Sequence, residues 1–168
     1  VNTDALLRLQ RVAERTRILA VIDHFRHAEL LSQSAQKSDS EIHVLVEVDV
    51  GLQSAGVRPG PDASLLATAA SRLPGLKVIG VFASAMDCRT EREPGGDPDK
   101  DLAAIVTIVD HGLRSICDVA GECREIVVSV TPASMRSLQD TRINCLVVSP
   151  FIDFADDTHE EFGNPVFV

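Results

Sequence analysis

Residues 42–50 read Ile-His-Val-Leu-Val-Glu-Val-Asp-Val and are followed directly by Gly51. Most of these residues are apolar, and five of the nine are β-branched, which is typical of a buried β-strand that ends at a glycine. Glu47 and Asp49 are two residues apart, so on a strand they point to the same face. Acids are seldom buried without partners, and this pair is therefore a candidate for acid–base work in a pocket or for ion pairing.

Four further apolar runs flank this stretch and predict strands, while the segments between them have helical patterns. The predicted strands cover residues 18–23, 77–85, 125–130 and 145–148, and the predicted helices cover 4–17, 24–37, 62–73 and 99–119, with at most a short helix at 134–140. Such an alternation, with connections long enough for crossover helices, indicates a parallel sheet covered by helices.

Two architectures fit this alternation: an open, flavodoxin-like sheet and part of a (β/α)₈ barrel. A complete barrel takes about 250 residues and eight strands, so five strands in 168 residues form at most an arc. Strand order separates the two, because a barrel places sequential strands side by side whereas the open fold has a switch point. In both architectures the functional side chains lie at the carboxyl ends of the strands.

Composition and charge exclude several classes of function. Sixteen basic and 25 acidic residues give a net charge of −9, which argues against a nucleic-acid partner. No apolar run approaches the roughly 20 residues that cross a bilayer, and no G-x-G-x-x-G or phosphate-loop motif is present. We therefore expect a single cytoplasmic domain over residues 1–168, without a membrane partner, whose residues 153–168 form an irregular acidic tail.

The cysteine and histidine residues show no metal-site spacing. The four cysteines lack a C-x-x-C pair, so we expect reduced and mostly buried thiols. His24 and His27 lie three residues apart after Asp23, and this pattern indicates a solvated helix start with Asp23 as its N-cap. The sequence predicts no metal site.

The segment Val44–Gly51, followed by Gly56-Val-Arg-Pro-Gly60, resembles the fourth-strand segment of the D-threonine aldolase and D-serine dehydratase family. These are fold-type III pyridoxal phosphate enzymes that share the alanine racemase N-terminal barrel. Two neighbouring features follow in the family's order. Leu73-Pro-Gly-Leu76 resembles the entry to the next strand, and Ser129-Val-Thr-Pro-Ala133 resembles the phosphate-binding turn.

The resemblance implies a partial (β/α)₈ barrel of about five parallel strands that lacks the first strands and the C-terminal β-domain. It also implies a pyridoxal 5'-phosphate cofactor and a small D-amino acid as the partner, acted on by a lyase. By the same resemblance, Ser129, Thr131 and Ser134 would hold the phosphate, and Asp49 would line the pocket. The family's divalent-metal site belongs to the C-terminal domain and is expected to be absent.

Departures from the family pattern predict that this chain is inactive, so no catalytic residue is assigned. The family's Schiff-base lysine lies upstream of the matching residues, and the chain has three lysines. Lys37 ends a predicted helix and Lys77 begins a predicted strand, which places both on the wrong side of a barrel, while Lys100 lies in an acidic cluster. The alternative is a degenerate barrel that serves as a binding or scaffold module. In either case, unpaired sheet edges favour homo-oligomers.

Overall fold

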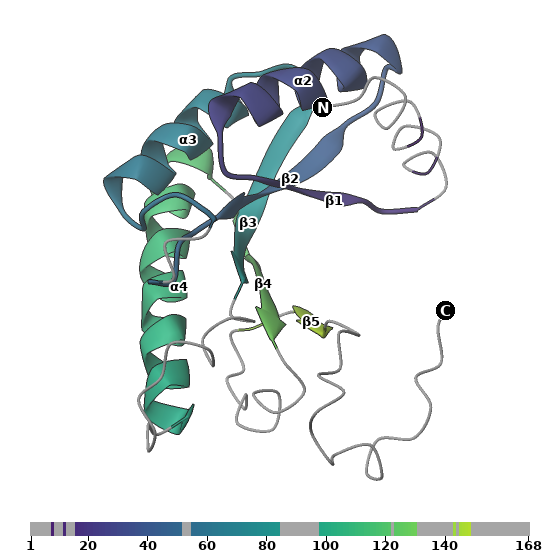
Figure 1. Ribbon diagram of the computed structural model, residues 1–168. Coiled ribbons are helices and arrows are strands. Elements are labelled where there is room, and N and C mark those ends of the chain that lie inside the picture. Colours follow the sequence, from purple (N-terminus) through teal and green to yellow (C-terminus); the bar gives the residue numbers. More distant parts are fainter. Residues whose placement is uncertain are drawn as a thin grey trace, which may run out of the picture.

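Five parallel strands form one sheet in the order β1-β2-β3-β4-β5, so each strand pairs with its neighbours in the sequence (Figure 1). The computed structural model describes residues 8, 12, 16–51, 55–84, 98–121, 123–130, 143 and 145–148. The strands are β1 (Leu19–Ile22), β2 (Ile42–Glu47), β3 (Leu76–Ser84), β4 (Glu125–Val130) and β5 (Cys145–Val148). Their parallel pairing matches the expectation drawn from the apolar runs.

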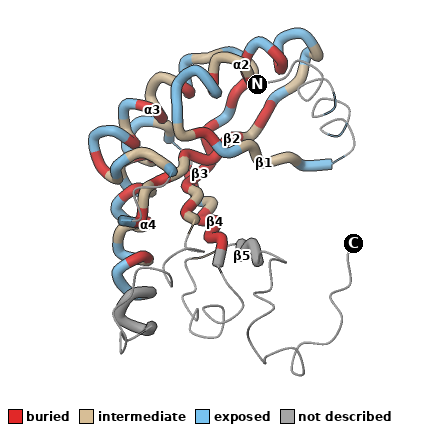
Figure 2. The backbone as a smooth tube through the Cα atoms, in the orientation of Figure 1, coloured by how far each residue is buried: buried red, intermediate tan, exposed pale blue. Residues whose placement is uncertain are grey.

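Three helices connect the first four strands, and each follows a strand as a crossover. They are α2 (Phe25–Lys37), α3 (Pro61–Ser71) and α4 (Pro98–Ala120). Pro61 stands at the first position of α3, where its missing N–H costs no helical hydrogen bond. Each helix buries one apolar face, for example Ala28, Leu31 and Ala35 of α2 (Figure 2).

The described helices cover the same face of the sheet. Their buried residues form one cluster with alternate residues of the strands, including Val44 and Val46 of β2 and Val81 of β3. An open doubly wound sheet carries helices on both faces and has a switch point in its strand order. The one-sided cover and the sequential order identify an arc of a (β/α) barrel, so the barrel prediction is confirmed and the flavodoxin-like alternative is wrong.

The opposite face of the sheet is the inside of the arc, which we call the concave face. Its apolar layer consists of strand residues: Leu45, Ile79 and Val127, with Leu19 and Phe82 packed against them. Because side chains alternate along a strand, these positions point away from the helices. Barrel interiors are filled by such layers of apolar side chains.

A close approach of β3 to β4 depends on Gly80. A Cβ atom at Gly80 would lie 1.9 Å from the backbone oxygen of Glu125, the residue with which Gly80 is in register. The pairing of β2 with β3 is irregular nearby, since the register shifts between Val44 and Leu45. The absence of a side chain therefore permits β4 to pair with a locally irregular strand.

The described elements differ from the sequence expectations mainly at the end of β2. The strand ends at Glu47 rather than Val50, because Val48 forms a bridge with Val57 from the following loop. The Val57 N–H donates to the Glu47 carbonyl at 2.9 Å, and the Asp49 N–H donates to the Val57 carbonyl at 2.9 Å. The predicted helix at 134–140 and the tail at 153–168 lie outside the described residues, and the predicted helix at 4–17 lies largely outside them.

Within the described part of the chain, no helix combines the length and apolar character needed to cross a membrane.

Candidate functional site

Polar side chains gather where the strands end, at an edge that we call the carboxyl rim. It comprises five residues at or just after the carboxyl ends of β1 to β4: Asp23, Glu47, Asp49, Ser84 and Ser129. Glu47 is in register with Phe82, and Ser84 is in register with Ser129. Since Phe82 belongs to the concave face, Glu47, Ser84 and Ser129 share that face.

Ser129 is the rim residue with the strongest indication of ligand binding. Its side chain is 5% exposed, and no hydrogen-bond partner for its hydroxyl is present among the described residues. A buried hydroxyl normally has a partner, because leaving one unsatisfied costs about 1–3 kcal/mol. A hydroxyl in this position both donates and accepts, and it could bind an oxygen-rich ligand at the carboxyl rim.

The surroundings of Glu47 disfavour a negative charge on its carboxyl group. Burial raises the pKa of its carboxyl group above the ordinary value of 4.5, and the neighbouring negative charge of Asp23 raises it further. Each effect favours the protonated form. The rim therefore brings two acids close enough to repel each other, a pattern typical of functional sites as well as of structural ion networks.

Asp23 follows β1 directly and is held by the helix that comes after it. Its Oδ1 lies 2.9 Å from Nδ1 of His27, one turn into α2. The predicted N-cap at Asp23 is wrong, since His24 caps α2: its Nδ1 accepts a hydrogen bond from the Arg26 N–H at 3.1 Å. The Asp23 carboxylate is consequently directed to His27 and toward Glu47 rather than to the helix backbone.

Asp49 lies beyond the end of β2 and is half-buried. Its Oδ1 accepts a hydrogen bond from the Gly51 N–H at 2.9 Å, which fixes the start of the loop. Asp49 thus lies at the carboxyl rim, and its predicted place in the lining of a cofactor pocket stays a prediction. Thr131 and Ser134, the other predicted phosphate contacts, lie outside the described residues.

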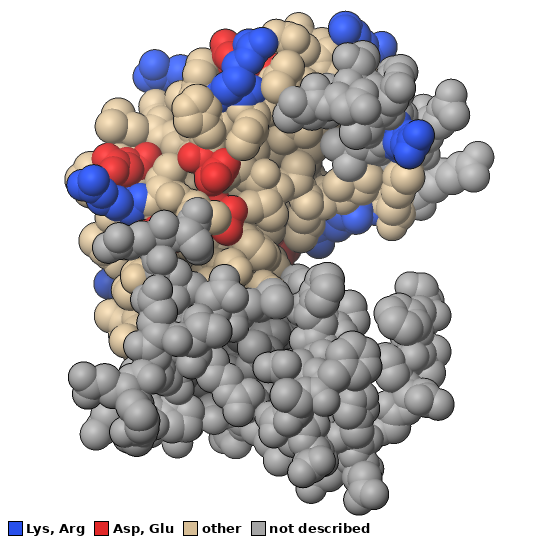
Figure 3. Space-filling view, viewed as in Figure 1, with Lys and Arg blue, Asp and Glu red and all other residues tan. Residues whose placement is uncertain are grey.

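Charge is distributed unevenly over the face seen in Figure 3. There, acidic side chains come together near the middle of the described surface, and basic side chains lie mostly toward its margins. The acids of the rim belong to different segments, so the fold rather than the local sequence brings Asp23 close to Glu47. A negative rim favours cationic groups and opposes the approach of a second anion.

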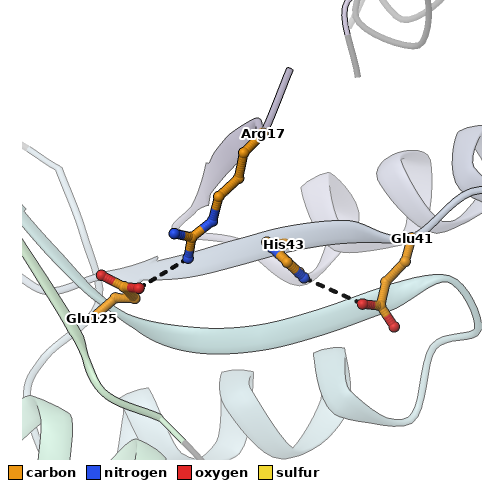
Figure 4. Close-up of polar contacts among 4 residues, drawn as sticks. All are labelled: Arg17, Glu41, His43 and Glu125. Atoms are coloured by element: carbon orange, nitrogen blue, oxygen red, sulfur yellow. Dashed lines mark hydrogen bonds and ion pairs between the residues drawn. The ribbon is translucent and has the colours of Figure 1, made fainter. Parts of the chain in front are cut away.

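At the opposite edge of the sheet, which we call the amino rim, two pairs of polar side chains are in contact. Arg17 Nη2 lies 2.9 Å from Glu125 Oε1, and His43 Nε2 lies 3.2 Å from Glu41 Oε1 (Figure 4). The first pair joins the residues before β1 to the start of β4, across two intervening strands. Three strand spacings span about 14 Å in a flat sheet, so the contact also reflects the curvature of the arc. No local sequence pattern predicted it.

The lysines whose side chains the structure describes do not lie at the carboxyl rim. Lys77 is in β3, seven residues before Ser84, which corresponds to about 23 Å along the strand. Lys37 ends α2, which runs back toward the amino rim. Lys100 is in the first turn of α4, and its side chain lies outside the described set.

No group of three or more His, Cys, Asp or Glu residues that could hold a metal ion occurs among the described residues. Asp23, His24 and His27 therefore do not make a metal site by themselves. The sequence assigned no metal ligand either.

Comparison with known proteins places this geometry in a family. The sequence profile of the family described as "Alanine racemase, N-terminal domain" matches residues 6–117, more than half of the chain. The chain belongs to the alanine racemase N-terminal domain family. This family is of the fold-type III pyridoxal phosphate class, so the family expected from the fourth-strand motif is confirmed. No curated protein sequence matches the chain.

Solved structures share the fold of this alanine racemase N-terminal domain. D-threonine aldolase from Filomicrobium marinum aligns with a TM-score of 0.74 and 24% identity, over 89% of this chain and 40% of that one. Alanine racemase from Clostridium difficile 630 gives 0.68 and 13%, over 94% and 39%. PipY from Synechococcus elongatus PCC7942 gives 0.65 and 14%, over 88% and 65%, and PipY has also been solved with PLP bound.

The chain thus spans about 40% of the length of the aldolase and of the racemase. These alignments show the arc of strands that the chain has in common with longer proteins.

The described residues fit one part of pyridoxal phosphate and not another. The buried hydroxyl of Ser129, which has no hydrogen-bond partner among the described residues, fits a phosphate oxygen, which accepts hydrogen bonds. The aldehyde requires an amine, and neither Lys37 nor Lys77 lies at the carboxyl rim. Among the described residues, the rim therefore has a hydroxyl that could bind the phosphate but no lysine side chain placed to bind the aldehyde.

Proposed function

We propose that this chain is a member of the pyridoxal phosphate-dependent D-amino-acid lyases, similar to D-threonine aldolase or D-serine dehydratase, and that its 168 residues do not turn over on their own. The observation that carries the proposal is the buried hydroxyl of Ser129 on the concave face at the carboxyl rim, which has no hydrogen-bond partner among the described residues. In barrels, ligands bind at that end of the strands. The positions of Lys37 and Lys77 at the other end support the lack of turnover.

Two residues of the rim, and two that follow β4 in the sequence, have distinct parts in this proposal. Ser129 donates its hydroxyl hydrogen to a phosphate oxygen, and Thr131 and Ser134 add contacts by resemblance to the family's phosphate-binding turn. Asp49 lines the pocket, held in place by its hydrogen bond from Gly51. Pyridoxal phosphate, when bound, supplies the electron sink for cleavage of a bond at the α-carbon of an amino acid.

A second candidate is a binding or scaffold module without pyridoxal chemistry. The proximity of Asp23 to Glu47 favours it, because a phosphate dianion at the same rim meets negative charge. In this case the barrel arc serves as a surface for binding another molecule, and the hydroxyl of Ser129 binds no anion.

Equilibrium binding distinguishes the two candidates. Titration calorimetry with pyridoxal phosphate, and separately with pyridoxal, compares ligands that differ in the phosphate. The lyase proposal expects the phosphorylated ligand to bind more tightly than pyridoxal. This difference should be smaller in Ser129→Ala and unchanged in the control variant Ser115→Ala, whose hydroxyl donates to the His111 carbonyl within α4. Equal and negligible binding of both ligands would instead favour the scaffold module.

A further inference from the structure

The connection between α4 and β4 holds two free thiols that the proposed function does not use. Cys117 lies in the last turn of α4, and Cys123 lies two residues before β4. Between them the chain reverses at Gly121, whose φ of +81° suits glycine. The Gly121 N–H donates to the Cys117 carbonyl at 3.1 Å, and the Cys123 N–H donates to the Gly121 carbonyl at 2.8 Å.

This turn brings the two sulfur atoms together. Sγ of Cys117 donates to the backbone carbonyl of Cys123 at 3.0 Å, and the two thiols lie close enough for each to affect the pKa of the other. Sγ of Cys123 reaches the carbonyl of Val78 in β3 at 3.5 Å. A helix end, a strand start and a neighbouring strand therefore hold the pair in place.

The surroundings of the pair determine how it can react. Cys123 is buried and Cys117 is half-buried, so a small reagent reaches the pair through Cys117. Burial raises the pKa of Cys117 and raises that of Cys123 to about 12. Both thiols are thus protonated at neutral pH, which makes each a slow nucleophile on its own. Their mutual contact is the feature that two isolated structural cysteines would lack.

We propose that Cys117 and Cys123 form an oxidisable dithiol, and that a peroxide converts it reversibly to an intramolecular disulfide linking α4 to β4. The sulfur of Cys117 attacks one peroxide oxygen, the O–O bond breaks, and water leaves after proton transfer, giving a sulfenic acid. The sulfur of Cys123 then attacks the Cys117 sulfur, the S–O bond breaks, and a second water leaves as the S–S bond forms. The two thiols lose two protons and two electrons, and hydrogen peroxide is reduced to two molecules of water.

The test uses the whole chain and hydrogen peroxide, followed by alkylation of the remaining thiols and tryptic mapping. Cleavage after Arg114 and Arg124 gives one peptide, residues 115–124, that contains both cysteines, whereas Cys88 and Cys145 fall in other peptides. We expect this peptide to lose two hydrogen atoms and to resist alkylation. A thiol reductant should restore alkylation at both positions.

Variants and an unfolded control show whether the folded geometry is responsible. Cys117→Ser should abolish the linked peptide, and the matched Cys88→Ser should leave it intact. The folded chain should yield the 115–124 link at least about tenfold in preference to links with Cys88 or Cys145, and urea should reduce that preference. Independent oxidation of Cys117 to a sulfinic acid, or equal pairing among the cysteines, would overturn the proposal. The wild-type map decides the matter even if Cys117→Ser does not fold.

Discussion

The two rims of the sheet carry similar residue types in opposite arrangements. At the amino rim, Arg17 is paired with Glu125, and His43 is paired with Glu41. At the carboxyl rim, Asp23 is bonded to His27, but it also raises the pKa of the half-buried Glu47, and Ser129 has a buried hydroxyl with no partner among the described residues. Paired side chains stabilise a fold, whereas unsatisfied groups cost stability and are retained where they act on a ligand. The contrast supports the proposal that the carboxyl rim binds a ligand while the amino rim has a structural role.

The largest expected effect on stability tests the structural role of the amino rim. Gly80→Ala places a Cβ atom against the backbone oxygen of Glu125, at the amino end of β4. We expect the free energy of unfolding to fall by about 3 kcal/mol, because the clash involves backbone that cannot rotate away. Urea denaturation followed by circular dichroism measures the change.

Gly51→Ala is the control for this substitution. No atom lies within 4 Å of a Cβ at Gly51, although its φ of +102° disfavours alanine. It should cost only about 1–2 kcal/mol. If both variants lost the same free energy of unfolding, the close approach of β3 to β4 would not be the reason why Gly80 is required.

The second effect concerns binding at the carboxyl rim. Ser129→Ala should weaken pyridoxal phosphate binding about tenfold, or about 1.4 kcal/mol, while stability stays the same or rises, because the substitution removes an unsatisfied buried hydroxyl. Calorimetry and urea denaturation give the two readouts. A loss of stability without a loss of affinity would assign Ser129 to the core instead.

A smaller effect is expected for the ion pair that crosses the arc. Because 58% of the Arg17 side chain and 28% of the Glu125 side chain are exposed, a double-mutant cycle with Arg17→Met and Glu125→Gln should give a coupling of about 0.5–1 kcal/mol. The pair Arg26–Glu29, also at 2.9 Å but within one helix turn, is the matched control at about 0.3 kcal/mol. A coupling energy below that of the control would show that the contact between Arg17 and Glu125 does not stabilise the curved sheet.

The smallest effect is a dependence of stability on pH from Glu47. Its pKa is raised in the folded chain, so the folded state binds more protons, and stability falls as pH rises from the ordinary value of 4.5 through the raised one. Glu47→Gln should remove this decline and stabilise the chain at neutral pH by about 0.5 kcal/mol or less, because solvent screens the group. Asp23→Asn should reduce the decline in part. Denaturation curves between pH 4 and 8 test both variants. An unchanged pH dependence in Glu47→Gln would show that the pKa of Glu47 is not raised, and an unchanged dependence in Asp23→Asn would show that Asp23 does not contribute to it.

Sequence patterns predicted most of the fold, since buried parallel strands are apolar runs that end at polar or glycine residues. The run at 42–50 and the later run at 125–130 placed β2 and β4 within a few residues. The early end of β2 was missed because the partner of Val48 is Val57 in a loop, and a run of apolar residues does not reveal which backbone it will pair with.

The candidate site was predicted less completely than the fold. Asp49 and Ser129 were assigned because they stand at strand ends in a recognisable motif, and their roles in binding stay predictions. Asp23 lies near Glu47 because β1 and β2 pair with Ile22 in register with Val46, whereas the pairing of Arg17 with Glu125 reflects the curvature of the sheet. Sequence spacing carries no information on such contacts. The N-cap at His24 was missed for a different reason, because Asp23 is the better capping residue in general but is bonded here to His27.

The proposal that this chain offers no amine to an aldehyde at the carboxyl rim, where the described residues place no lysine side chain, is tested most directly by reductive trapping. The purified chain is incubated with pyridoxal phosphate, reduced with borohydride and mapped by mass spectrometry, with D-threonine cleavage followed in parallel and Lys100→Arg as the control for the lysine whose side chain is not described. We predict no stoichiometric adduct on any lysine and no cleavage of D-threonine. One adduct per chain on a single lysine, together with cleavage that is lost when that lysine is replaced, would contradict the account.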